Sequence, residues 1–281
     1  MQFNNQQDNN LYNQETIEHF SLLLSKYKTI MKSERIQTKG FKFKQFSIYG
    51  GESGMPVNTD GVMLGAWANC TQQNKILDIG TGTGLLALMC AQRFPSAQIT
   101  ALDIEITAIE AAKQNFAQSP WSDRLSLHHS DVLQFEPEHR FERIICNPPY
   151  FNNGEQSKQS QRATARHTDT LQHSALLNRC HELLTEEGTA NFVLPITEGE
   201  QFITMALQQG WHLSRLCRVQ PSQKKPVHRL LFELAKQACD TQETHLIIHS
   251  SEGYSDDFIQ LTREFYLKMW NNMWSLSPIT L

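Results

Sequence analysis

Three closely spaced glycines follow directly after an apolar stretch of this 281-residue chain. Residues 75–84 read Lys-Ile-Leu-Asp-Ile-Gly-Thr-Gly-Thr-Gly, and a helix-like apolar pattern begins at Leu85. Glycine lets a backbone turn tightly and approach a ligand closely, so a strand that passes through such a turn into a helix is typical of nucleotide-binding α/β folds. The dinucleotide fingerprint G-x-G-x-x-G would need a glycine at position 85, so this spacing disfavours an NAD site.

Apolar runs of strand length recur after residue 74 and alternate with helical patterns in the first half of the chain. The strand-like runs are residues 75–79, 98–102, 125–128, 143–146, 189–194, 213–219, 230–234 and 245–249. The helical patterns are residues 85–93, 105–117 and 171–184. The alternation predicts an α/β fold with a largely parallel sheet covered by helices on both faces. The later runs follow one another with less helix, which predicts an antiparallel end to the sheet.

The first part of the chain differs from the rest. Residues 1–14 contain five Asn and four Gln, which is typical of a disordered tract, and residues 16–31 have the apolar spacing of one amphipathic helix. We therefore expect an N-terminal extension over residues 1–37 and one catalytic domain over residues 38–275. Residues 41–49 alternate as a short strand or hairpin would, and Thr59 or Asp60 is expected to cap a helix that follows.

Composition excludes several classes of protein. Apolar residues make up 40% of the chain, which excludes wholesale disorder, and no apolar run is long enough to cross a membrane. The six cysteines form no C-x-x-C pair, which argues against a zinc site, so we expect no metal. With no signal-peptide pattern at the N-terminus, we expect a cytoplasmic protein, and we expect it to be a monomer.

Basic residues are concentrated in segments 28–44, 157–167 and 223–229, although the formal net charge of the chain is −4. This segregation points to a polyanionic partner, and the alternative is a set of solvated surface loops. The segment 151–170 is also long and polar, as functional loops are. The basic residues include Lys42 and Lys44 in the first basic segment, Arg162 and Arg166 in the second, and Lys224, Lys225 and Arg229 in the third.

Two acidic residues follow the strands after the glycine motif. Asp103 ends the second strand-like run, 19 residues after Gly84, where a carboxylate can accept hydrogen bonds from two ribose hydroxyls. The alternative is that Asp103 caps the next helix. Asp131 follows Ser130 after the third run, and a Ser-Asp pair is also common in turns.

The sequence Asn147-Pro148-Pro149-Tyr150 directly follows the fourth strand-like run. Two prolines fix the backbone and remove amide donors, so carbonyl oxygens are left to face a ligand. The Asn147 side-chain oxygen and the Pro148 carbonyl can both accept protons from one planar –NH₂ group. Tyr150 offers a flat face on which a base can stack. Such acceptors would aim the nitrogen lone pair of an amine at an electrophile without a dedicated base.

The G-x-G-x-G loop preceded by Asp78 resembles the nucleotide loop of S-adenosylmethionine-dependent methyltransferases, and N-P-P-Y resembles the motif of those that modify exocyclic or amide nitrogens. Segments 41–46, 58–67, 118–121, 210–213 and 265–267 look like the bacterial tRNA1(Val) (adenine(37)-N6)-methyltransferase family. The resemblance covers residues 40–270. It implies a Rossmann-like fold with a seven-stranded, mostly parallel sheet, S-adenosylmethionine as cofactor and tRNA as partner.

The resemblance also implies residue roles. Asn147, Pro148, Pro149 and Tyr150 would hold the target adenine. The cofactor would be bound by Thr59, Asp60, Asp78, Gly80, Gly82, Gly84, Asp103 and Asp131, with Asp78 at the methionine ammonium and Asp131 at the adenine amine. The tRNA would contact Lys42, Lys44, Arg162, Arg166, Lys224, Lys225, His228 and Arg229, and the loop that holds Arg162, Arg166 and His167 would close over the site or grip the tRNA.

Three other functions remain open at this point. A protein glutamine N5-methyltransferase would use N-P-P-Y on a side-chain amide, but such enzymes usually carry an added N-terminal helical domain. A DNA adenine methyltransferase would normally bring a separate target-recognition region. A non-catalytic RNA-binding module is disfavoured by the intact glycines, Asp103 and the complete N-P-P-Y motif.

Overall fold

A computed structural model describes residues 39–52, 56–69, 75–148 and 162–267, and the side chains of residues 162–172 are outside the described part. The expected division into an extension over residues 1–37 and a domain over residues 38–275 stays a prediction, because the whole extension lies outside the described residues. The expected hairpin before the first helix is confirmed, since β1 (Phe41–Lys42) pairs antiparallel with β2 (Ser47–Ile48).

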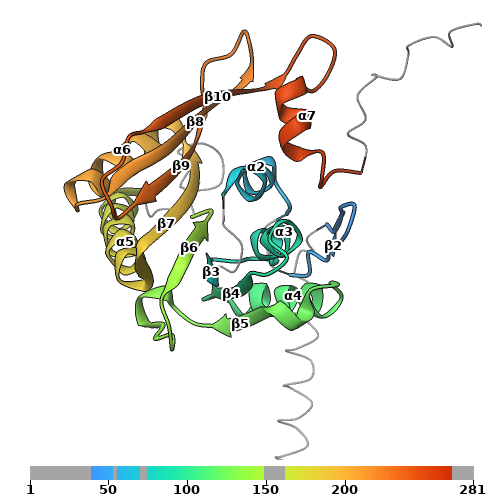
Figure 1. The fold of residues 1–281 in the computed structure, drawn as a ribbon, viewed down its shortest axis with the longest axis vertical. Helices are drawn as coiled ribbons and strands as arrows, with labels where there is room; N and C mark the ends of the chain where they lie inside the picture. Colours follow the sequence, from blue (N-terminus) through green and yellow to red (C-terminus); the bar gives the residue numbers. More distant parts are fainter. Residues whose placement is uncertain (1–38, 53–55, 70–74, 149–161, 268–281) are drawn as a thin grey trace, which may run out of the picture. The chain divides into compact units, whose positions relative to one another are not determined.

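One eight-stranded sheet forms the centre of the described domain, in the order β10-β8-β9-β7-β6-β3-β4-β5 (Figure 1). In the part of the sheet with the order β7-β6-β3-β4-β5, each strand is parallel to the next one. Strand β9 is antiparallel to both β7 and β8, and β10 is parallel to β8. The strands are β3 (Lys75–Ile79), β4 (Gln98–Asp103), β5 (Leu125–His129), β6 (Phe141–Cys146), β7 (Leu184–Pro195), β8 (His212–Ser222), β9 (Arg229–Ala235) and β10 (Gln242–His249).

The expected fold class is confirmed, but the sheet has eight strands rather than the expected seven. The additional strand is β10, which lies at the edge beside β8. Its first four residues are exposed, and only Leu246 and Ile248 are buried, so it adds one narrow apolar stripe to the core. The apolar run at residues 245–249 had marked this strand, whereas the number seven came from the family resemblance.

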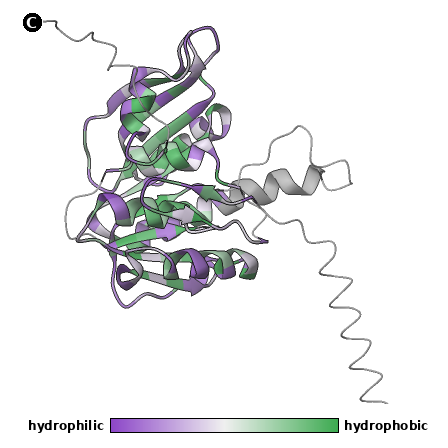
Figure 2. Ribbon diagram, turned by 90° about the vertical axis from the view of Figure 1, so that its right-hand side faces the viewer, coloured by the Kyte–Doolittle hydropathy of each residue, from purple (hydrophilic) through white to green (hydrophobic). Residues whose placement is uncertain are grey.

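Helices cover both faces of the sheet, and each face has its own core. One cluster of buried side chains contains residues of α2, α3, α4 and α7, and the other contains residues of α5 and α6. Apolar residues are concentrated along the strands between these layers (Figure 2). The helices are α2 (Thr59–Trp67), α3 (Leu85–Arg93), α4 (Ile106–Ala117), α5 (Arg162–Leu183), α6 (Ile196–Gln208) and α7 (Asp256–Thr262), with single turns η1 (Ser122–Arg124) and η2 (Val132–Gln134).

Side-chain alternation explains why the parallel strands read as continuous apolar runs. Ile76 belongs to one core cluster and its neighbour Leu77 to the other, because successive strand residues point to opposite faces of a sheet. A strand that is covered on both faces therefore needs apolar residues at consecutive positions rather than at every second position. No helix in the described part is both long and apolar enough to cross a membrane.

Two local expectations were wrong. Helix α2 is capped by Asn58, whose side-chain oxygen accepts from the Gly61 N–H at 2.8 Å, and neither Thr59 nor Asp60 holds the cap position. The expected loop over residues 151–170 is also too long, because α5 begins at Arg162. Arg162 and Arg166 therefore lie on a helix, and their side chains are outside the described part of the chain.

A buried asparagine ties the N-terminal hairpin to the glycine loop. The Asn115 side chain on α4 accepts from the Tyr49 N–H at 2.7 Å and donates to the Tyr49 carbonyl at 3.0 Å. The same amide nitrogen donates to the Thr83 carbonyl at 2.8 Å. Because Asn115 is only 1% exposed, these bonds compete little with water and fix the glycine loop against α4.

Candidate active site

The glycine loop joins β3 to α3 with three residues in left-handed conformations. The φ angles of Gly80, Gly82 and Gly84 are 68°, 56° and 84°, which other residue types rarely adopt. A Cβ atom on Gly84 would lie 2.5 Å from Cε1 of Phe116, so this glycine allows α3 and α4 to pack closely. A Cβ on Gly80 or Gly82 would meet nothing within 4 Å, so open space lies in front of these two glycines.

Asp78 is a fully buried carboxylate directly before the loop. Its Oδ2 accepts from the Thr81 hydroxyl at 2.6 Å and from the Ala87 N–H at 3.0 Å. Its Oδ1 is buried and has no hydrogen-bond partner among the residues that the structure describes. Burial raises the pKa of Asp78 from 3.8 to about 7. A cationic group that bonded Oδ1 would supply the missing partner and favour the ionised form.

Asp103 connects the end of β4 to the glycine loop. Its Oδ2 accepts from the Gly82 N–H at 2.8 Å, and its Oδ1 accepts from the Glu105 N–H at 2.9 Å just before α4. Asp103 does not cap α4, a role that the sequence had left open, because the cap residue is Glu105 and no side chain caps that helix. An ionised carboxylate has about four acceptor positions, so two remain for hydroxyl donors.

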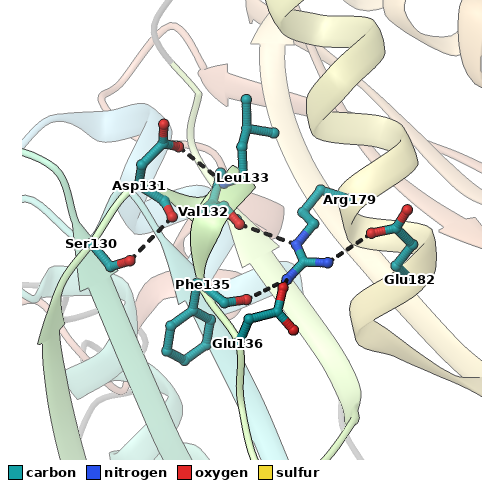
Figure 3. A network of polar contacts seen from close by, with 8 residues as sticks. All are labelled: Ser130, Asp131, Val132, Leu133, Phe135, Glu136, Arg179 and Glu182. Carbon is teal, nitrogen blue, oxygen red and sulfur yellow. Dashed lines mark hydrogen bonds and ion pairs between the residues drawn. The ribbon is translucent and has the colours of Figure 1, made fainter.

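Asp131 lies at the end of β5 and caps η2 by accepting from the Leu133 N–H at 3.0 Å (Figure 3). The guanidinium of Arg179 on α5 holds the same turn, since it donates to the carbonyls of Val132 and Phe135. Arg179 also pairs with Glu136 at 2.9 Å and Glu182 at 2.7 Å. Helix α5 therefore fixes the segment that presents Asp131.

Two exposed apolar residues beside these carboxylates were missed by the sequence analysis. Ile104, directly after Asp103, is 61% exposed, and Leu133 in η2 is 47% exposed. They follow adjacent parallel strands, so both lie at the edge of the sheet where the carboxylates gather. The sequence offered no signal for them, because exposure is a property of the folded chain.

Asn147 and Pro148 follow β6, which is the neighbour of β3 in the sheet. The Asn147 side-chain oxygen is buried and has no hydrogen-bond partner within the described ranges. Its amide nitrogen lies 4.0 Å from the position of a Cβ on Gly61, so Asn147 sits beside the first turn of α2. Pro148 is buried. Pro149 and Tyr150 lie outside the described residues, and their expected roles stay predictions.

The first turn of α2 is joined to the far half of the sheet by an ion pair. Nε of Arg229, at the start of β9, donates to Oδ2 of Asp60 at 2.8 Å. Thus an expected cofactor residue and an expected tRNA residue contact each other. A pocket of about 400 Å³ lies at this ion pair, and its lining includes Asp60, Arg229, Thr59 and His228.

The other expected tRNA residues occupy separate places. Lys42 lies on the β1–β2 hairpin, and Lys44 follows in its turn and donates to the Arg263 carbonyl. Lys224 and Lys225 are exposed in the turn between β8 and β9, which the Lys225 N–H closes onto the Ser222 carbonyl at 3.0 Å. Figure 1 shows the hairpin and this turn well apart. Within the described ranges, no three His, Cys, Asp or Glu side chains gather as metal ligands would.

Comparison with known proteins identifies the family. Residues 62–195 match the methyltransferase small domain. A curated tRNA1(Val) (adenine(37)-N6)-methyltransferase of Vibrio campbellii is 96% identical over 239 residues, which are 85% of this chain and 100% of that protein. Relatives of the same name are 76% identical in Vibrio parahaemolyticus and 57% identical in Vibrio cholerae, with the same coverage.

A solved structure supports the fold. The crystal structure of a predicted O-methyltransferase, protein Atu636 from Agrobacterium tumefaciens, matches with a TM-score of 0.59 at 15% identity and covers 73% of this chain and 96% of that one. At this identity the match bears on the fold alone. The sequence relatives, the matched domain and the site after β3 to β6 lead to one assignment. The chain belongs to the tRNA1(Val) (adenine(37)-N6)-methyltransferase family.

Proposed function

We propose that the protein transfers a methyl group from S-adenosylmethionine to N6 of adenosine 37 in tRNA1(Val), in the cytoplasm. The observation that carries this proposal is the buried, unpartnered Asn147 oxygen at the end of β6, beside the glycine loop at the end of β3. The names of the relatives supply the substrate, and the described residues supply a site that fits its chemistry.

The residues at the ends of β3, β4 and β5 fit S-adenosylmethionine. Asp78 Oδ1 would accept from the methionine ammonium, and the open space at Gly80 and Gly82 would admit the ligand. Asp103 would accept from the ribose hydroxyls. Asp131 would accept from the adenine amine, while Ile104 and Leu133 would cover the ring. We assign Asp60 to shaping the site rather than to direct cofactor contact, because its carboxylate pairs with Arg229.

The chain's own residues would prepare the nucleophile. The Asn147 oxygen and the Pro148 carbonyl would accept hydrogen bonds from the two N–H groups of the adenine amine, which draws the nitrogen toward a tetrahedral geometry and localises its lone pair. The role expected for Tyr150, which lies outside the described residues, is to stack on the base. S-adenosylmethionine supplies, when bound, a methyl group activated by a sulfonium sulfur. The localised lone pair would attack that methyl carbon as its bond to sulfur breaks, S-adenosylhomocysteine would leave, and the extra proton on the nitrogen would pass to solvent.

An assay with methyl-labelled S-adenosylmethionine tests the proposal. Unmodified total tRNA, genomic DNA and a release-factor-like protein fraction are offered in parallel, and nucleosides are analysed by mass spectrometry. We expect label as N6-methyladenosine in tRNA, and hybridisation then names the tRNA. Label in protein alone would replace the proposal with glutamine methylation, and label in DNA alone would replace it with DNA adenine methylation.

The β8–β9 turn yields a separate prediction about tRNA binding. Replacing both Lys224 and Lys225 by alanine should weaken tRNA binding and make the slope of log K against log salt shallower by about 2, since each lost phosphate contact removes about 0.9. Fluorescence titrations at several salt concentrations measure the slope. The matched control replaces Lys75 and Lys113, which are also exposed, and should leave it unchanged. An unchanged slope in the turn variant would remove these lysines from the tRNA interface.

A further inference from the structure

The pocket of about 400 Å³ beside α2 is built from five separate parts of the chain, one of which is Pro221 near the end of β8. Asn58 and Asp60 come from the start of α2, Arg229 from the start of β9, His249 from the end of β10, and Tyr254 from the segment before α7. Its size is within the range of about 300–1,000 Å³ that small-molecule sites occupy. None of the cofactor roles assigned to the ends of β3, β4 and β5 uses it.

Strand order places this pocket on the opposite side of Asn147 from the cofactor residues that follow β3, β4 and β5, although Thr59, which was also expected at the cofactor, lines it. The glycine loop, Asp103 and Asp131 follow β3, β4 and β5, whereas Asn147 follows β6. Two further steps across the sheet, about 10 Å at the usual strand spacing, lead from β6 through β7 to β9, where Arg229 lines the pocket. A nucleic-acid strand whose target base sits at Asn147 would therefore reach the pocket with a neighbouring nucleotide.

The wall formed by β10 and the segment after it carries a column of aromatic rings. The His249 and Tyr254 rings stack with centroids 4.9 Å apart and 21° between their planes. Tyr254 stacks in turn on Phe258, at 4.9 Å and 22°. Phe258 is fully buried in the core, whereas Tyr254 is 47% exposed and His249 is also exposed. The column is thus anchored at one end and presents flat surface at the other.

Such a surface suits an unstacked base. A base that leaves an RNA loop to enter an active site loses its stacking contacts, and so does its neighbour. Stacking of that neighbouring base on an aromatic side chain would contribute about 1–3 kcal/mol to the free energy of binding. Arg229 also lines the pocket, and the exposed Lys224 and Lys225 lie in the turn that leads from β8 into His228 and Arg229.

We propose that this pocket receives the nucleotide adjacent to the target adenosine, with its base stacked on the ring column formed by His249 and Tyr254. The proposal rests on the proposed function, since it takes tRNA as the substrate. It gives β10, the strand beyond the expected seven, a part in holding the anticodon loop. It also assigns His249 and Tyr254 to substrate binding, which the sequence motifs did not indicate.

The test measures steady-state kinetics on an unmodified anticodon stem-loop. Tyr254→Ala should raise KM for the stem-loop about tenfold, as expected for the loss of one base stack, with kcat within twofold. Tyr254→Phe keeps the ring and should behave as the wild type. Calorimetric titration with S-adenosylmethionine should give the same Kd for all variants. His249→Ala removes the exposed ring and leaves Tyr254 packed on Phe258, so it should also raise KM for the stem-loop. This variant keeps the test valid if Tyr254→Ala fails to fold.

A fluorescent base separates this inference from the catalytic one. Stem-loops that carry 2-aminopurine on either side of the target adenosine should change emission on binding the wild type, and one of them should lose that change with His249→Ala. If the wild type methylates the stem-loop while both alanine variants keep its KM and emission change, the pocket proposal is overturned and the function stands. A weaker S-adenosylmethionine Kd with an unchanged stem-loop KM would assign the pocket to the cofactor instead. If the wild type binds the stem-loop without methylating it, the function fails while the emission change still tests the pocket.

Discussion

Replacing Asn147 by alanine should lower kcat by about 10²–10³-fold while the Kd for S-adenosylmethionine stays within twofold. The buried Asn147 oxygen is the acceptor that we assign to the amine of the target base, and the loss of one preorganised hydrogen-bonding group at a reacting centre has an effect of this size. Single-turnover methylation of the stem-loop measures the first quantity, and calorimetry measures the second.

Asn147→Asp is the comparison variant, because it keeps an acceptor oxygen at the same position and replaces the –NH₂ group by a second oxygen that carries a negative charge. It should retain more activity than the alanine variant. A variant of Asn147 that lost S-adenosylmethionine affinity and kept normal turnover would contradict the role assigned to this residue. Equal losses in the alanine and aspartate variants would show that the acceptor oxygen is not what matters.

Asp78→Asn should weaken S-adenosylmethionine binding about 100-fold, because truncating one member of a buried charge pair typically costs 2–5 kcal/mol. The substitution preserves shape. The amide oxygen can still accept from the Thr81 hydroxyl and the Ala87 N–H, while the –NH₂ group replaces the unpartnered Oδ1 and meets the ammonium as a donor. Calorimetry at about pH 8, where wild-type Asp78 is ionised, measures the difference.

The same variant should stabilise the cofactor-free protein at high pH. The pKa of Asp78 is about 7 in the folded protein and 3.8 without the fold, so the folded state holds the proton to higher pH. Wild-type stability therefore falls as the pH rises from about 4 to 7, and the variant lacks this loss. The gain at pH 8 is on the order of 4 kcal/mol, at about 1.4 kcal/mol per pKa unit.

Urea unfolding without cofactor, at about pH 5 and about pH 8, measures this gain. The difference between the variant and the wild type should be larger at pH 8. A difference that was equal at the two pH values would contradict the raised pKa. Thr81→Val provides a comparison, because it removes one hydrogen bond to the ionised carboxylate and should lower wild-type stability mainly at pH 8.

Local sequence patterns predicted most of the sheet because each pattern reflects local physics. The run at residues 75–79 matches β3 at both ends, and the pattern at residues 85–93 matches α3, since the glycines between them fix where the strand stops and the helix starts. Helix α6 was not predicted. It begins directly after Pro195 with Ile-Thr-Glu-Gly-Glu-Gln, and a polar stretch with a central glycine reads as a loop rather than as the start of a helix.

The candidate site was predictable where it depends on residues that end strands. Asp78, Asp103 and Asn147 each follow or end a parallel strand, so strand order alone brings them to one edge. The contact between Asp60 and Arg229 could not be predicted, because it joins residues 169 positions apart through the antiparallel end of the sheet. The exposed apolar residues Ile104 and Leu133 gave no signal of their own, since exposure is a property of the folded chain.

The ion pair between Asp60 and Arg229 can form only late in the synthesis of the chain on the ribosome. The two residues are 169 positions apart, so at about 5–20 residues per second Arg229 is added roughly 8–34 s after Asp60. Until then the nascent chain can build the β3–β6 half of the sheet, but the Asp60 carboxylate lacks the guanidinium that neutralises it. The cofactor half can thus assemble while translation continues, whereas the half that meets Arg229 is completed only near the end of synthesis.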